Sequence, residues 1–377
     1  MSKNNGITAN EILLKIVRCT YFNACEETND ALNSLSVLNS SKQKLLVKEL
    51  LYLLERNKLS ATLLGNYQYS FSYGGARKLI EEALEKDLQY TRNYFTVLKQ
   101  VVKTLNKVDV NYVLIKHYLM KHVKMLDIDL HIYDPDEILR ACEALSKLDA
   151  IFYDFRFFSH PLKLGIKVLS IDPLGEVSVE IYPEIAVGRI IVGCSREFMD
   201  KATKVAIADA TNEAFDARML PVTENLYTML THDWYSQHIP LSTVVYLLAN
   251  IHRCDVNRLQ QLGEKHGTVA SVYTFLKLAS ALDKALQIGV VSEDIRRISE
   301  VSNFHGKASI DRWVKEVESR LKFPLEIPYK FIFSSMPYHI TKIVKKIGVI
   351  KTLYDVYSHF IPLLTYLYEF GKRFTHA

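Results

Sequence analysis

The chain has 377 residues, of which 49% are hydrophobic and 24% are charged, and its formal net charge is +5. This length and composition predict a folded, helix-rich protein with a substantial core divided into two or three domains. The small positive charge is far from that of a protein that coats nucleic acid, although it is compatible with a polyphosphate or RNA substrate.

The cysteines and the apolar segments exclude further classes. The five cysteines are scattered without a CxxC pair. This indicates reduced intracellular thiols rather than a zinc knuckle or a disulfide framework. The N-terminus lacks the apolar core of a signal peptide, and no stretch of about 18 uncharged apolar residues is present. We therefore expect a cytoplasmic protein that does not enter a membrane.

Residues 1–107 are predicted to form an N-terminal helical region. Apolar residues recur at helical spacing, and residues 76–107 predict one or two long helices. The segment Tyr73-Gly-Gly-Ala-Arg77 resembles a phosphate-binding loop, but no strand precedes it and no Gly-Lys-Ser/Thr follows it. We interpret it as the turn that begins a helix.

Residues 108–205 change from helical to strand periodicity. Strands are predicted at 110–115 and 126–133, joined by a short helix or turn, and a helix at 134–148 begins with a proline and an acidic first turn. A further strand is expected at 152–158. Residues 166–171 and 177–182 flank a turn-forming segment and predict a hairpin.

Residues 206–377 are predicted to return to helix from about Val222 onward. His232, His238 and His252 do not share one helical face, so we interpret them as structural residues. A basic stripe near the C-terminus is interpreted as a solvated helix face, with RNA contact as the alternative; it comprises Lys342, Lys345, Lys346 and Lys351. The fold class expected is α+β, with a small mixed sheet flanked by N-terminal and C-terminal helical regions.

Two aspartates stand out in the second predicted strand. Asp127 and Asp129 are two residues apart in an apolar run, so both carboxylates leave the same face of a strand. Like charges this close cost stability unless a cation lies between them, and oxygen ligands favour Mg²⁺ or Mn²⁺. Glu180 alternates with apolar residues in the hairpin. It becomes a third carboxylate if its strand lies beside the aspartates, and otherwise it faces solvent.

This order of elements resembles the nucleotidyltransferase core of the DNA polymerase β-like superfamily. More narrowly, it is similar to a loosely characterised prokaryotic branch whose first strand reads V-x-Y-V-L-[IL]-K and whose second reads D-[IL]-D-[IL]. Val110–Lys116 and Asp127–Leu130 carry this likeness, and Glu180 is the best match to the third acid. The resemblance implies transfer of a nucleoside monophosphate from an NTP, with release of pyrophosphate. Asp127, Asp129 and Glu180 would bind Mg²⁺ or Mn²⁺, and Glu180 would act as the base.

The chain departs from this family after the first strand, where related proteins carry glycine and this chain carries His117. We therefore expect lysine side chains to bind the phosphates, with Lys116, Lys121 and Lys124 as candidates. His131 shares the face of Asp129 and either contacts the nucleotide or packs at the strand end. The acceptor stays open between RNA (including tRNA), protein and small molecules. The alternative is a non-catalytic, antitoxin-like or nucleotide-binding module that retains the fold.

Overall fold

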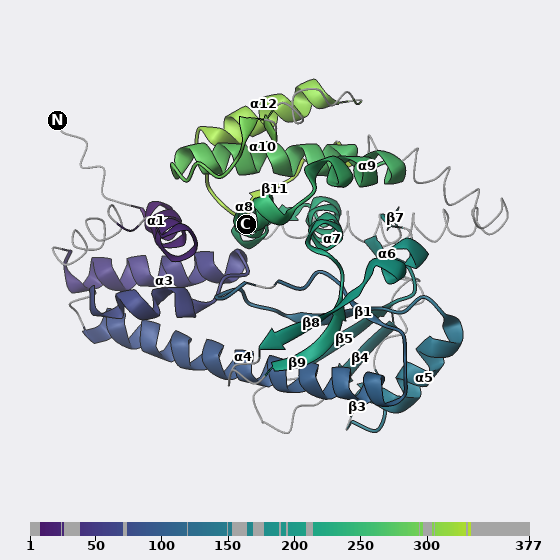
Figure 1. Cartoon of the computed structure of the whole chain (residues 1–377). Helices are drawn as coiled ribbons and strands as arrows, with labels where there is room; N and C mark the ends of the chain where they lie inside the picture. Colours follow the sequence, from purple (N-terminus) through teal and green to yellow (C-terminus); the bar gives the residue numbers. More distant parts are fainter. Residues whose placement is uncertain are drawn as a thin grey trace, which may run out of the picture.

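A computed structural model gives the fold, in which a mixed sheet lies between N-terminal and C-terminal helices, as the α+β prediction requires (Figure 1). No helix in the described part of the chain is long and apolar enough to cross a membrane. The structure describes residues 8–23, 25, 38–70, 74–118, 120–148, 150–152, 164–168, 177–187, 190–193, 195–208, 214–293, 295–296, 304, 306–328 and 331–332.

The N-terminal helices are α1 (Ala9–Phe22), α3 (Ser40–Arg56), the 3₁₀ helix η2 (Ala61–Ser70) and the long α4 (Gly74–Lys107). A reciprocal capping box between Thr8 and Glu11 begins α1. The glycine pair at 74–75 begins α4, which confirms the helix-start interpretation. The first half of α4 contacts α3 and η2, and its second half packs against the sheet. This helix therefore ties the N-terminal region to the sheet.

Seven of the described strands form one sheet in the order β3-β4-β5-β2-β1-β9-β8. Strand β2 lies at its centre, antiparallel to β1 and parallel to β5, and the predicted hairpin of β4 and β5 is present. The strands are β1 (Val113–Leu114), β2 (Asp127–His131), β3 (Ala150–Phe152), β4 (Leu164–Val168), β5 (Val177–Tyr182), β8 (Thr203–Ala208) and β9 (Ala214–Met219).

The two faces of the sheet belong to different cores. Ile128, Leu130 and Val179 pack against α4 and against α5 (Pro135–Leu145). Val113 and Ile115 point to the other face and join the core of the C-terminal helices. Side chains alternate between the two faces of a strand. Asp127 and Asp129, which alternate with Ile128 and Leu130 in β2, therefore point toward the C-terminal helices.

From Val222 onward the described part of the chain is helical, as predicted, apart from one short strand pair. Its buried helix α7 (Val222–Tyr235) faces the sheet, and α8 (Leu241–Asn250) packs beside it. The remaining elements are β6 (Ala186–Val187), β7 (Ile190–Ile191), α6 (Ser195–Lys201), β10 (His238–Ile239), η3 (Ile251–Arg253), α9 (Val256–His266), α10 (Val269–Ala285), α12 (Lys307–Glu318) and β11 (Leu325–Glu326). The predicted basic stripe at 342–351 and the hairpin turn at 172–176 lie outside the described residues.

The described residues after β1 form turns and an isolated bridge between Leu59 and Val123, so the turn is the one of the two predicted alternatives that is present. Two other features differ from the sequence-based expectations. The sheet extends to Met219 rather than ending near 205, because β9 pairs with β1 and β8 pairs with β9. Cys19 and Cys25 are joined by a disulfide, where the scattered spacing indicated reduced thiols.

Asn57 joins distant parts of the chain. It is fully buried after α3, and its side-chain oxygen accepts a hydrogen bond of 2.8 Å from the amide of Leu241, at the start of α8. Its amide group donates to the carbonyls of Leu53 and Phe323 at 2.8 and 3.2 Å. One side chain therefore links the N-terminal helices to two parts of the C-terminal region.

We predict that Asn57→Ala lowers the free energy of unfolding by about 2–4 kcal/mol, because it leaves the buried amide of Leu241 without its partner. Urea denaturation measures the loss. The matched control is Asn39→Ala at the exposed cap of α3, which should cost only about 1 kcal/mol. Equal losses in the two variants would contradict the linking role of Asn57.

Candidate functional site

Asp127, Asp129 and Glu180 lie on the sheet face that points toward the C-terminal helices. In the parallel pairing of β2 with β5, Glu180 is directly opposite Asp129, and Asp127 is opposite Ser178. Directly paired residues of adjacent strands share a face. Of the two alternatives that the sequence left open for Glu180, the structure therefore shows the one in which its strand lies beside the aspartates.

Lys116 supplies the cation that the paired acids require. Its ammonium Nζ lies 2.9 Å from Oδ1 of Asp129, and the two side chains are only 12% and 14% exposed. The same Nζ donates to the hydroxyl of Tyr182 at 3.1 Å, and that hydroxyl donates to Oε2 of Glu180 at 2.6 Å. Lys116 thus contacts one acid directly and the other through Tyr182.

The backbone aims Lys116 at this face. Lys116 follows the last residues of β1 with a φ of 55°, a left-handed conformation that is uncommon outside glycine. Such a residue costs about 1–3 kcal/mol and persists only where the surroundings compensate for it. The charge pairing with Asp129 provides compensation, so the strain and the ion pair are parts of one arrangement.

Tyr182 and Tyr94 report the electrostatics of the acids. Burial, then the charges of Asp129 and Glu180, raise the pKa of Tyr182 well above its ordinary value. Its hydroxyl therefore stays protonated and can donate the hydrogen bond to Glu180. Burial first, with smaller contributions from both Asp129 and Asp127, also raises the pKa of Tyr94. The charges of both aspartates therefore contribute to the raised pKa of the same tyrosine of α4.

The other predicted phosphate ligands lie elsewhere. Lys124 pairs with Asp87 of α4, with 3.4 Å between Nζ and Oδ1, and its ammonium lies over the ring of Tyr90. Lys121 is exposed on the connecting segment. His131 is fully buried, and its Nδ1 lies 2.7 Å from the carbonyl oxygen of Tyr182, which favours packing at the strand end. Of the three lysines, Lys116 is the one paired with a predicted acid.

His117, at the position where the resemblance led us to expect glycine, turns inward. Its side chain is 3% exposed and stacks on Tyr94, whose hydroxyl lies 3.3 Å from Nδ1. Burial lowers the pKa of His117 to about 4, although the charge of Asp129 opposes the shift. The amide of Asn225 on α7 donates to the His117 carbonyl at 2.7 Å. The histidine is therefore a neutral core residue that ties the β1 connector to the C-terminal helices.

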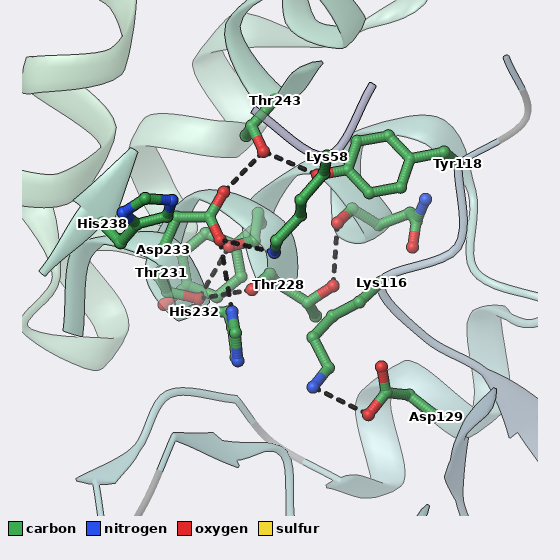
Figure 2. A network of polar contacts seen from close by, with 12 residues as sticks. Lys58, Lys116, Tyr118, Asp129, Thr228, Thr231, His232, Asp233, His238 and Thr243 are labelled. Atoms are coloured by element: carbon green, nitrogen blue, oxygen red, sulfur yellow. Dashed lines mark hydrogen bonds and ion pairs between the residues drawn. The ribbon is translucent and has the colours of Figure 1, made fainter. Parts of the chain in front are cut away.

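A second charged group, which the sequence reasoning missed, lies beside the first (Figure 2). Asp233 of α7 is buried and accepts a hydrogen bond of 2.5 Å from the hydroxyl of Thr243. Its Oδ1 lies 3.6 Å from Nζ of Lys58 and 3.3 Å from Nδ1 of His232. Burial favours the neutral acid, but Lys58, His232 and Thr243 outweigh it and lower the pKa of Asp233.

The two charged groups are electrostatically connected. Asp233 is the main cause of the raised pKa of Lys58, and the charge of Asp129 contributes in the same direction. Burial, followed by the positive charge of Lys116, lowers the pKa of His232. One signal for this group was present in the sequence, because Asp233 follows His232 directly, although the spacing to His238 and His252 indicated structural residues. No local sequence motif indicated that Lys58 belongs to this group.

A pocket of about 550 Å³ adjoins the site behind the β1–β2 connector. Aromatic rings and hydroxyl groups dominate its lining, among them Tyr90, Tyr94, Phe95, Tyr118, Ser60 and Thr62. Tyr118 connects this pocket to the group around Asp233. It lines the pocket, and its hydroxyl shares a hydrogen bond of 2.7 Å with Thr243, which binds Asp233.

The chemistry of the acids suits a hard divalent cation, because carboxylate oxygens are its preferred ligands. As the side chains stand, however, no group of three or more His, Cys, Asp or Glu side chains within the described ranges could hold a metal ion. Lys116 instead occupies the charge-balancing position at Asp129.

Comparisons with family models, curated proteins and solved structures found no match to this chain.

We predict that His117 makes stability depend on pH. The folded protein holds its pKa near 4, below the unfolded value of about 6.5, so the unfolded chain binds the proton more readily. This contribution destabilises the fold progressively as pH falls from about 6.5 toward 4, and reaches about 2 kcal/mol at pH 5.

Urea denaturation of the wild type and of His117→Gln at pH 7.5 and 5 tests this. The variant should lose about 2 kcal/mol less stability than the wild type between the two pH values. The same pH-dependent loss in both proteins would show that His117 is not held neutral.

Proposed function

We propose that this protein is a metal-dependent nucleotidyltransferase that moves a nucleoside monophosphate from an NTP to an acceptor. The observation that carries the proposal is the placement of Glu180 opposite Asp129 on adjacent parallel strands, with Asp127 on the same face. The likeness of the first two strands to the DNA polymerase β-like nucleotidyltransferases supports it. Three acids on one sheet face have no evident packing role.

With Lys116 moved away from Asp129, the carboxylates of Asp127, Asp129 and Glu180 would hold Mg²⁺ or Mn²⁺. Such an ion would supply positive charge to a triphosphate and to the acceptor hydroxyl. Lys116 keeps this face balanced before the ligand arrives, and its ammonium then becomes available to a phosphate oxygen. Glu180 would receive the proton of the acceptor hydroxyl, and Tyr182 orients the Glu180 carboxylate through a hydrogen bond of 2.6 Å.

The acceptor belongs to one of three classes, namely RNA (including tRNA), protein, or a small hydroxylated molecule. A non-catalytic nucleotide-binding or antitoxin-like module is the second candidate, and a specific observation favours it. His117 removes the close backbone approach to phosphate that glycine allows, and its side chain is buried rather than directed at a ligand. Such a module would bind a nucleotide without transferring it.

We predict that Asp127→Asn and Asp129→Asn each reduce transfer of label from an NTP to total RNA or extract protein by more than about 100-fold. An amide cannot supply the charge of a metal ligand, and even partners that only support a ligand are worth about 10–100-fold. The matched control is Asp216→Asn, an exposed aspartate on β9 of the same sheet, which should transfer at the wild-type rate.

The reactions contain Mg²⁺ or Mn²⁺, and circular dichroism confirms that each variant is folded. Transfer at the wild-type rate by either Asp127→Asn or Asp129→Asn would refute the proposed site. Nucleotide binding by the wild type with no transfer to any of the three acceptor classes would support the binding module instead.

A further inference from the structure

The proposed reaction leaves a shortage of cations. A triphosphate carries several negative charges, and enzymes that transfer phosphoryl or nucleotidyl groups stabilise it with several positive groups. Of the three lysines predicted for this role, Lys124 pairs with Asp87, and Lys121 is exposed on the connector, where it lines the pocket. A further side-chain cation close to Lys116 would strengthen triphosphate binding beyond what the metal supplies.

We infer that Lys58, from the turn after α3, binds the phosphate tail of the substrate together with Lys116. This inference rests on the proposed function and assigns a substrate-binding residue to the N-terminal region. Figure 2 shows Lys58 and Lys116 reaching from different segments toward the neighbourhood of His232 and Asp233. Lys58 and His232 both contact the Asp233 carboxylate, at 3.6 and 3.3 Å. Burial, then the charges of Lys116 and Lys58, lower the pKa of His232.

The turn that carries Lys58 is firmly held. Lys58 follows the buried Asn57 and has a φ of 53°, which is left-handed like the φ of 55° at Lys116. Its carbonyl accepts the amide of Lys124 at 2.9 Å, and the amide of Ser60 donates to the His122 carbonyl at 2.8 Å. The turn is therefore pinned to the connector that follows Lys116, so the two lysines are positioned by the same piece of structure.

The surroundings of Lys58 suit a binding group. Its ammonium is 3.6 Å from Asp233, which is longer than a direct hydrogen bond, and the side chain is 28% exposed. An ammonium has three N–H donors, so an ion pair with one carboxylate leaves donors for a second anion. Asp233 itself is anchored by Thr243. Lys58 is thus held charged at a fixed place while part of it stays open to solvent.

A purely structural role predicts different behaviour. If Lys58 served only to neutralise Asp233, removing both charges together would restore everything that removing one of them lost. If Lys58 binds phosphate, the double substitution would restore stability but not anion binding. The comparison of single and double variants therefore separates the two roles.

The test is calorimetric titration with inorganic tripolyphosphate in the absence of metal. The variants are Lys58→Met, Lys58→Met combined with Asp233→Asn, and Lys58→Arg. Methionine keeps the length of the stem and imposes the same backbone strain as lysine. The matched control is Lys124→Met combined with Asp87→Asn, which removes a similar pair on α4. Thermal unfolding of each protein provides the stability readout.

We expect Lys58→Met to weaken tripolyphosphate binding by about 10- to 100-fold, the worth of a charge-assisted hydrogen bond. The double variant should unfold near the wild-type temperature and stay equally weak, while Lys58→Arg and the Lys124 control should bind within about threefold of the wild type. Wild-type affinity in the double variant, or no binding by the wild-type protein, would overturn the inference.

Failure of the inference is distinguishable from failure of the proposed function. A protein that transfers nucleotide in an Asp129-dependent manner, yet binds tripolyphosphate independently of Lys58, keeps its function and loses this residue. Lys58-dependent binding of tripolyphosphate in a protein that transfers nothing would establish the anion site and refute the transferase.

Discussion

The ion pair between Lys116 and Asp129 is the interaction on which the site depends. Acids on a partly buried sheet face are unfavourable unless a cation accompanies them. Here the cation comes from the same chain, at a distance of 2.9 Å, and extends through Tyr182 to Glu180. The ion pair also compensates for the left-handed backbone conformation of Lys116. Charge balance at this face therefore determines how the chain leaves β1.

The site is assembled from all three parts of the chain. The sheet contributes the acids, α7 contributes Asp233 and His232, and the turn after α3 contributes Lys58. Asn57 fastens that turn to α8, and Asn225 fastens the connector to α7. The N-terminal helical region is thus part of the site's construction rather than a separate appendage.

The sequence predicted those features that follow from local periodicity. The two-residue spacing of Asp127 and Asp129 and the alternation around Glu180 place side chains on a face, and the structure pairs the two strands accordingly. The long helix beginning at Gly74 and the helix beginning at Pro135 follow from local start signals. Strands β8 and β9 were not predicted because their six-residue segments mix polar, charged and apolar residues, a composition that resembles a loop.

What the sequence could not predict depends on contacts between distant residues. Lys124 looked like a phosphate ligand by its position, but Asp87 of α4 binds it instead. His117 stands where glycine was expected, and the sequence could not show that tertiary packing buries it against Tyr94. Lys58 and Asp233 are 175 residues apart in the chain and carry no motif, so only folding brings them together.

We propose that Lys116 balances the charge of the acidic face until metal and nucleotide bind there. The decisive measurement is a crystal structure with Mn²⁺ and a non-hydrolysable NTP analogue. We expect Mn²⁺ bound by Asp127 and Asp129, with the Lys116 ammonium moved from Asp129 to a phosphate oxygen. Metal and nucleotide bound elsewhere, with the ion pair between Lys116 and Asp129 intact, would contradict it.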